Sequence, residues 1–181
     1  TDLFSRGDAL NRWPALAAVA WYLALLALGA MTFPLVSLAF GSFPDRGWSV
    51  ARTAGLLGSA WIAWLASSVL PLDHTPALVA VATAGLAGCG AAAAWIWRSE
   101  LHAWWRGNRR LIVAEEALFL GLFVLFLVIR AANPDLWHPH FGGEKPMDFA
   151  YLNATLRTVS FPPFDPWFAG VVLPGMIIVG L

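Results

Sequence analysis

The chain has 181 residues, of which 59% are hydrophobic and 12% are charged, and its formal net charge is zero. Soluble globular domains carry about 25% charged residues, so this composition favours an integral membrane protein. A neutral chain without a basic surface excludes nucleic acid as a partner, and membrane lipids are the first partners that we expect. The single cysteine, Cys89, excludes an intrachain disulfide.

Long apolar stretches recur along the chain and predict membrane spans at residues 14–40, 53–70, 77–97 and 111–129. Each approaches or exceeds the roughly 20 residues that cross a hydrocarbon core. We therefore predict an all-α, polytopic transmembrane helix bundle of about four complete spans plus a partial fifth. It comprises a polar N-terminal segment (1–13), a four-span bundle (14–129), an external motif loop with a short interfacial helix (130–170) and the start of a fifth apolar segment (171–181).

The third predicted span contains Gly85, Gly88 and Gly90, small residues of the kind that let membrane helices approach closely. The chain starts without methionine and stops inside an apolar stretch, so we expect it to be processed, truncated or otherwise partial.

Arginines predict the orientation of the bundle. Loops 41–52 and 98–110 are dense in arginine, whereas the basic residues of the other side are spread over a longer length. Because arginine-rich loops favour the cytoplasm, we expect integration in the cell (inner) membrane with residues 131–170 on the external face. Tryptophans near the ends of the spans fit an interfacial belt.

Glu115 and Glu116 lie one turn into the fourth predicted span. Ionisable groups are costly there and suggest a function. The alternative, which we favour, is that these carboxylates reach the interface or pair with Arg109 or Arg110.

The polar segment that interrupts the apolar chain is the strongest candidate for a site. Pro146 suits the first turn of a helix, so a short helix beginning near Lys145 or Pro146 is expected. Its apolar positions and its polar positions form separate lines along that helix. The apolar line is Phe149, Leu152, Leu156 and Val159, and the polar line is Asp148, Tyr151 and Thr155.

The residues after this helix predict rigid geometry, because Pro162-Pro163 favours an extended backbone and Asp165-Pro166 a turn. Such geometry would place Asp165 facing Asp148. One acid would then take a proton from an acceptor hydroxyl while Lys145 and Arg157 hold a phosphate leaving group. The alternative is that Asp148 only complements the helix dipole, an effect of about 0.3 to 1 kcal/mol.

His138 and His140 have a spacing that suits two ligands of one metal, but the sequence fixes no third ligand. Interfacial polar side chains are the default interpretation. The sequence does not identify a cofactor, and a divalent metal is the candidate.

The same segment resembles a family of very hydrophobic bacterial and archaeal membrane proteins of unknown function that is named for a Tyr-Tyr-Tyr motif. The resemblance runs from about Glu115 to Gly170. Its residues are Arg130, Asn133-Pro134-Asp135, Gly143-Glu144-Lys145-Pro146-Met147-Asp148-Phe149-Ala150, Asn153, Pro162-Pro163, Asp165-Pro166-Trp167 and Ala169-Gly170. That family in turn is similar to the GT-C superfamily of integral-membrane glycosyltransferases, in which the first large external loop carries an acidic catalytic residue.

The resemblance implies sugar transfer from a polyprenyl-phosphate donor. It implies Asp148 as base, then Glu144, with Asp165 as a positioning or metal-assisting acid. The implied substrate-binding residues are Lys145, Arg157 and Tyr151. Two features depart from the pattern, since residues 171–181 hold no tyrosine and a GT-C enzyme needs more spans than four. Either the remaining spans are missing, or this is a short relative without activity.

A second hypothesis is a noncatalytic structural or accessory subunit, whose spans pack against other subunits of a larger membrane complex. A transporter is weaker, because only Glu115 and Glu116 place ionisable groups inside a predicted span.

Overall fold

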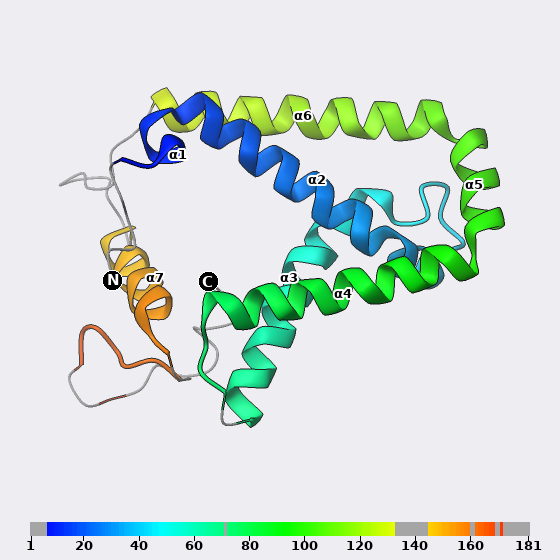
Figure 1. Cartoon of the computed structure of the whole chain (residues 1–181). Coiled ribbons are helices and arrows are strands. Elements are labelled where there is room, and N and C mark those ends of the chain that lie inside the picture. The colour runs from blue at the N-terminus through cyan, green and yellow to red at the C-terminus, as the bar shows by residue number, and fades with distance from the viewer. Residues whose placement is uncertain (1–6, 71, 133–144, 160–161, 169–170, 172–181) are drawn as a thin grey trace. The chain divides into compact units, whose positions relative to one another are not determined.

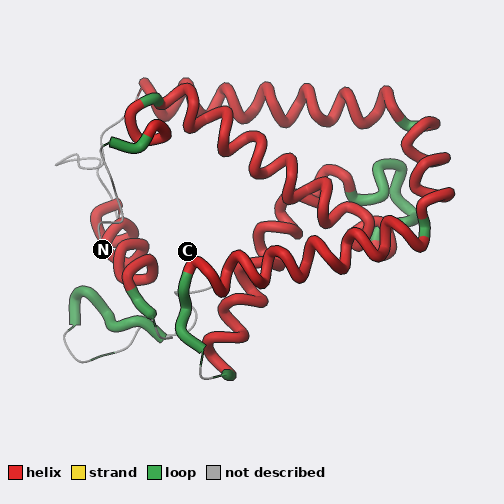
Figure 2. The backbone as a smooth tube through the Cα atoms, in the orientation of Figure 1, coloured by secondary structure: helices red, strands yellow, loops and turns green. Residues whose placement is uncertain are grey.

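The computed structural model describes residues 7–70, 72–132, 145–159, 162–168 and 171. Regular structure in these residues is helical, as predicted, and no strand occurs among them (Figures 1 and 2). The helices are α1 (Ala9–Arg12), α2 (Pro14–Ala39), α3 (Trp48–Val69), α4 (Pro76–Ile96), α5 (Arg98–Gly107), α6 (Arg109–Ala132) and α7 (Lys145–Arg157).

Three helices in the described part of the chain are long and apolar enough to cross a membrane, namely α2, α4 and α6. The prediction of four complete spans was therefore too high by one for the described residues. The second predicted span, 53–70, lies in α3, which is long enough but less apolar. Arg52 begins its second turn, and Ser59 and Ser67 interrupt its apolar residues. The fifth segment lies outside the described residues except for Val171.

Helix α6 shows why the chain needs a membrane. At about 1.5 Å per residue its 24 residues extend about 36 Å, more than the roughly 30 Å of a hydrocarbon core. Its apolar side chains are exposed along its length, among them Val113, Leu118, Phe126 and Val128. A large exposed apolar surface is unfavourable in water and is what a lipid-facing helix requires.

Residues 98–110, expected to be a loop, instead contain helix α5 and the start of α6. Leu101, Trp104 and Trp105 fall on one side of α5, and Leu101 and Trp104 are half-buried against the aromatic cluster described below, which stabilises the helix.

The helices form two compact units, described separately here. The first comprises Thr1–Ser59 with Thr83–Ile112, and the second Ala60–Ala82 with Val113–Leu181.

In the first unit, helices α2, α3 and α4 approach closely at small residues. The Thr32 hydroxyl in α2 lies 2.7 Å from the Ala51 carbonyl oxygen in α3. A Cβ added at Gly90 in α4 would overlap the carbonyl oxygen of Met31 in α2. The small-residue prediction for the third span is thus confirmed at Gly90, whereas a Cβ at Gly85 or Gly88 would meet nothing within 4 Å.

The core of the first unit is aromatic. Phe33 packs against Trp48 and Trp104, with ring centroids 5.1 Å apart in both pairs, and Trp48 packs edge-on against Trp105 at 5.1 Å. Ala51 and Ile112 complete the buried cluster. This packing joins α5 to α2 and α3.

Asp45 caps α3 from the preceding turn. Its carboxylate accepts hydrogen bonds from the backbone N–H groups of Gly47 and Ser49, at 3.1 and 3.2 Å, and from the Ser49 hydroxyl at 2.6 Å. Burial raises the pKa of Asp45, but these hydrogen bonds together outweigh burial and hold the pKa below its ordinary value. The turn needs a glycine at position 47, where φ is +79° and a Cβ would lie 2.6 Å from Val36 Cγ1.

Candidate functional site

Helix α7, in the second unit, carries most of the predicted site residues. It begins at Lys145 with Pro146 as its second residue, which confirms the predicted helix start. Proline fits there because its fixed φ suits a helix and its missing N–H would have no intrahelical partner. Asp148 follows in the first turn and is exposed, so its charge faces outward at the positive end of the helix dipole.

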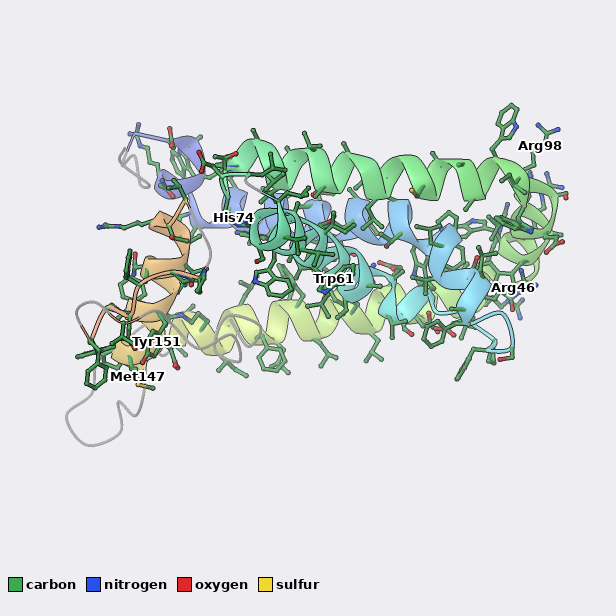
Figure 3. The ribbon with its side chains drawn as sticks, turned by 90° about the horizontal axis from the view of Figure 1, so that it is seen from below. Arg46, Trp61, His74, Arg98, Met147 and Tyr151 are labelled. Carbon is green, nitrogen blue, oxygen red and sulfur yellow. The ribbon has the colours of Figure 1, made fainter. Side chains whose placement is uncertain are left out.

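The two predicted lines along α7 are present in the structure except for Val159, which lies beyond the end of the helix at Arg157. Phe149, Leu152 and Leu156 are 52%, 41% and 55% exposed and share one side of the helix. Tyr151 and Thr155, which form the adjacent polar line with Asp148, are half-buried, and the Thr155 hydroxyl donates to the Tyr151 carbonyl oxygen at 3.0 Å. Figure 3 labels Met147 and Tyr151 on this helix. Such an exposed apolar line is available for contact with lipid or with another helix.

Arg157 ends α7 and is exposed. It lies about two and a half turns beyond Asp148, so the two residues are on opposite sides of α7 and about 13 Å apart along its axis. The helix therefore does not bring the Arg157 guanidinium and the Asp148 carboxylate to one point.

The Asp165 carboxylate accepts hydrogen bonds within its own turn. Its Oδ1 atom accepts hydrogen bonds from the backbone N–H groups of Trp167 and Phe168, at 2.8 and 3.3 Å. The backbone N–H of Asp165 donates to the Val171 carbonyl oxygen at 2.8 Å. The carboxylate thus closes the turn that the sequence predicted, and none of its hydrogen bonds among the described residues joins it to Asp148.

Several of the predicted site residues lie outside the part of the chain that the structure describes. Glu144 and the pair His138 and His140 are not among the described residues, and Lys145 is described only by its place in α7. Among the residues that are described, no group of three His, Cys, Asp or Glu side chains is placed to hold a metal.

A contact that sequence reasoning missed ties the segment after α7 to the turn between α3 and α4. The backbone N–H of His74 donates to the Val159 carbonyl oxygen at 2.7 Å. His74 Nδ1 also lies 3.2 Å from the Ser67 hydroxyl oxygen, and burial lowers the pKa of its imidazole. The second residue after α7 is thereby fixed beside the α3–α4 turn. Val159 and His74 are far apart in the sequence, and no local pattern predicts their pairing.

Exposed apolar helices that are long enough to cross a bilayer define an integral membrane protein. A family model described as "Uncharacterized membrane protein (DUF2298)" matches residues 59–174, more than half of the chain, and the chain belongs to this family. The match includes α7 and the Asp165 turn. No curated protein and no solved structure matches the chain. The predicted membership of an uncharacterised membrane family is thus confirmed, while no match links the chain to glycosyltransferases.

Proposed function

We propose that this chain is part of a membrane glycosyltransferase that transfers a sugar from a polyprenyl-phosphate donor, with Asp148 as the base. The observation that carries the proposal is the exposed Asp148 carboxylate in the first turn of α7, beside an exposed apolar line on the same helix. A lipid-linked sugar presents its phosphate and its first sugar at the bilayer surface. A helix that lies in that surface holds its carboxylate at the same depth.

The proposed reaction is a direct displacement. The Asp148 carboxylate takes the proton from an acceptor hydroxyl as the hydroxyl oxygen bonds to the anomeric carbon of the donor sugar. The bond between that carbon and the phosphate oxygen breaks, and polyprenyl phosphate leaves with the electron pair. Lys145, one turn before Asp148 at the start of α7, is assigned to the leaving phosphate.

The remaining predicted residues receive secondary roles. Arg157 and Asp148 are on opposite sides of α7, so Arg157 is assigned to a lipid or donor phosphate away from the reacting carbon. Tyr151 is next to Asp148 on its side of the helix and is assigned to substrate hydroxyls. Asp165 is assigned to positioning through its turn, and Glu144 is the next candidate for the base.

The orientation belongs to the same proposal. Residues 130–170 are placed on the external face of the cell membrane, because the arginines of 41–52 and 98–110 favour the cytoplasm.

The test is transfer of a radiolabelled sugar from a polyprenyl-phosphate donor by the full-length protein in vesicles. Wild-type protein should transfer label, and Asp148→Asn should lose about 10²- to 10⁴-fold in rate. Adding and then chelating a divalent metal determines whether a metal takes part. Equal rates for the wild type and Asp148→Asn would exclude Asp148 as the base.

A noncatalytic subunit of a larger membrane complex is the second candidate. It is favoured by α4, where Gly85 and Gly88 leave open space for an approaching helix. Purification in mild detergent separates the two candidates. A persistent stoichiometric complex with other membrane proteins, without binding of donor lipid, would favour the subunit.

A further inference from the structure

Helix α5 is held at the end of two candidate spans. Helix α4 ends at Ile96 and α6 begins at Arg109, so only Trp97 and Asn108 separate α5 from these apolar helices (Figure 1). When α4 and α6 cross a bilayer, such short connections keep α5 at the boundary between the hydrocarbon and water.

The inner side of α5 is fixed by packing. Leu101 and Trp104 contact the buried cluster of the first unit, and Trp104 Nε1–H donates to the Pro44 carbonyl oxygen at 3.1 Å. The Trp105 ring packs against Trp48. Helix α5 therefore has one defined orientation about its axis.

A line of basic residues runs along α5 beside its packed side. Arg98, His102 and Arg106 are exposed and recur every fourth residue, which places them in one line with about 6 Å between successive residues. Arg109 and Arg110 follow and are exposed, and Arg46 lies at the same end of the first unit as Arg98 (Figure 3).

Among the described residues of the first unit, Glu100 and Asp45 are the acidic residues nearest to this surface in the sequence. Glu100 is on the other side of α5 from Arg98. The Asp45 carboxylate is occupied by the cap of α3. Positive charge is therefore in excess at this end of the unit.

We propose that Arg98, Arg106, Arg109 and Arg110 form a binding surface for the phosphate head groups of anionic membrane lipids. Arginine matches phosphate because its guanidinium donates several hydrogen bonds in a fixed plane. This surface is separate from α7 and does not depend on the proposed sugar transfer.

The flanking side chains favour a lipid over an acidic protein as the occupant. Trp95 is 73% exposed with the Arg98 guanidinium 5.0 Å from its ring centroid, and Ile96 beside it is 65% exposed. Tryptophan next to arginine at the end of an apolar helix suits the head-group region, where the ring meets the acyl chains and the cation meets phosphate.

The test is native mass spectrometry of the full-length protein in detergent, titrated with phosphatidylglycerol or with phosphatidylcholine of the same acyl chains. The wild type should prefer phosphatidylglycerol. The double variant Arg98→Gln/Arg106→Gln should bind phosphatidylglycerol about 30-fold more weakly. The charge-preserving Arg98→Lys/Arg106→Lys should stay within about threefold of the wild type, because most of the attraction is electrostatic.

The matched control is Arg12→Gln/Arg130→Gln, which removes two exposed arginines outside this surface and should change binding less than about twofold. Circular dichroism checks that each variant keeps its helices, and Arg109→Gln/Arg110→Gln replaces the first variant if it does not. Equal losses in the surface and control variants would overturn the proposal. A wild-type protein that binds phosphatidylglycerol and phosphatidylcholine equally well would also overturn it. The same holds if the purified wild type retains an acidic protein instead of lipid.

Discussion

Replacing Gly90 with alanine tests the closest helix contact in the first unit. An added Cβ would overlap the Met31 carbonyl oxygen and lie 3.0 Å from the Met31 carbonyl carbon, whereas ordinary contacts begin at 3.4 Å. Backbone atoms cannot rotate away as a side chain can, so α2 and α4 must separate. Overpacking of this kind costs about 1 to 3 kcal/mol.

The control for this prediction is Gly88→Ala in the same helix, where the new methyl group meets nothing within 4 Å. Thermal unfolding of both variants in the same detergent is the assay. We expect Gly90→Ala to unfold roughly 2 to 12 °C below the wild type, and Gly88→Ala to unfold at or above it because alanine favours the helix. Equal midpoints for the two variants would refute the close approach of α2 and α4.

Two further predictions concern the turns. Asp45→Ala should lower the free energy of unfolding by about 0.5 to 2 kcal/mol through loss of the α3 cap. Asp45→Asn, which keeps an acceptor oxygen, should lose less in the same denaturation assay, and equal losses would contradict the cap. Because burial lowers the pKa of His74, the unfolded chain takes up a proton before the folded chain as pH falls below about 6.5. The free energy of unfolding should therefore be highest above that pH and fall as the pH is lowered. In the His74→Gln variant it should fall less between pH 7.5 and 5.5. The same pH dependence in both proteins would contradict burial of the neutral imidazole.

The helices were predictable where the signal was local. Long apolar stretches predicted α2, α4 and α6, and Pro146 with the spacing of Phe149, Leu152 and Leu156 predicted α7. These signals depend on properties of neighbouring residues, such as the fixed φ of proline and the helical period.

The predictions for residues 98–110 and 53–70 were wrong. In each case one property of the sequence received more weight than a second property that indicated the observed structure. The charges of 98–110 suggested a loop, although Leu101, Trp104 and Trp105 repeat with a helical period that identifies α5. Length suggested a span at 53–70, although Arg52 and the serines of α3 make it less apolar than its neighbours.

The site was predictable in part. Its helix and the turn at Asp165 follow from proline positions, but the partners of a side chain depend on tertiary structure. The hydrogen bonds from the backbone of Trp167 and Phe168 to the Asp165 carboxylate were not predicted, and the expectation that Asp165 faces Asp148 stays a prediction. The link between His74 and Val159 joins segments that no local pattern connects.

The most direct test of the proposed sugar transfer compares two matched substitutions in the full-length protein, Asp148→Asn and Asp165→Asn. Initial rates of transfer from a polyprenyl-phosphate sugar are measured in vesicles, with binding of the donor measured separately. Asp148→Asn should lose about 10²- to 10⁴-fold in rate with donor binding retained, because the amide cannot accept the proton. Asp165→Asn should keep most of its activity, because its Oδ1 still accepts the Trp167 N–H. Wild-type activity in Asp148→Asn, or no transfer by the wild type, would contradict the proposal.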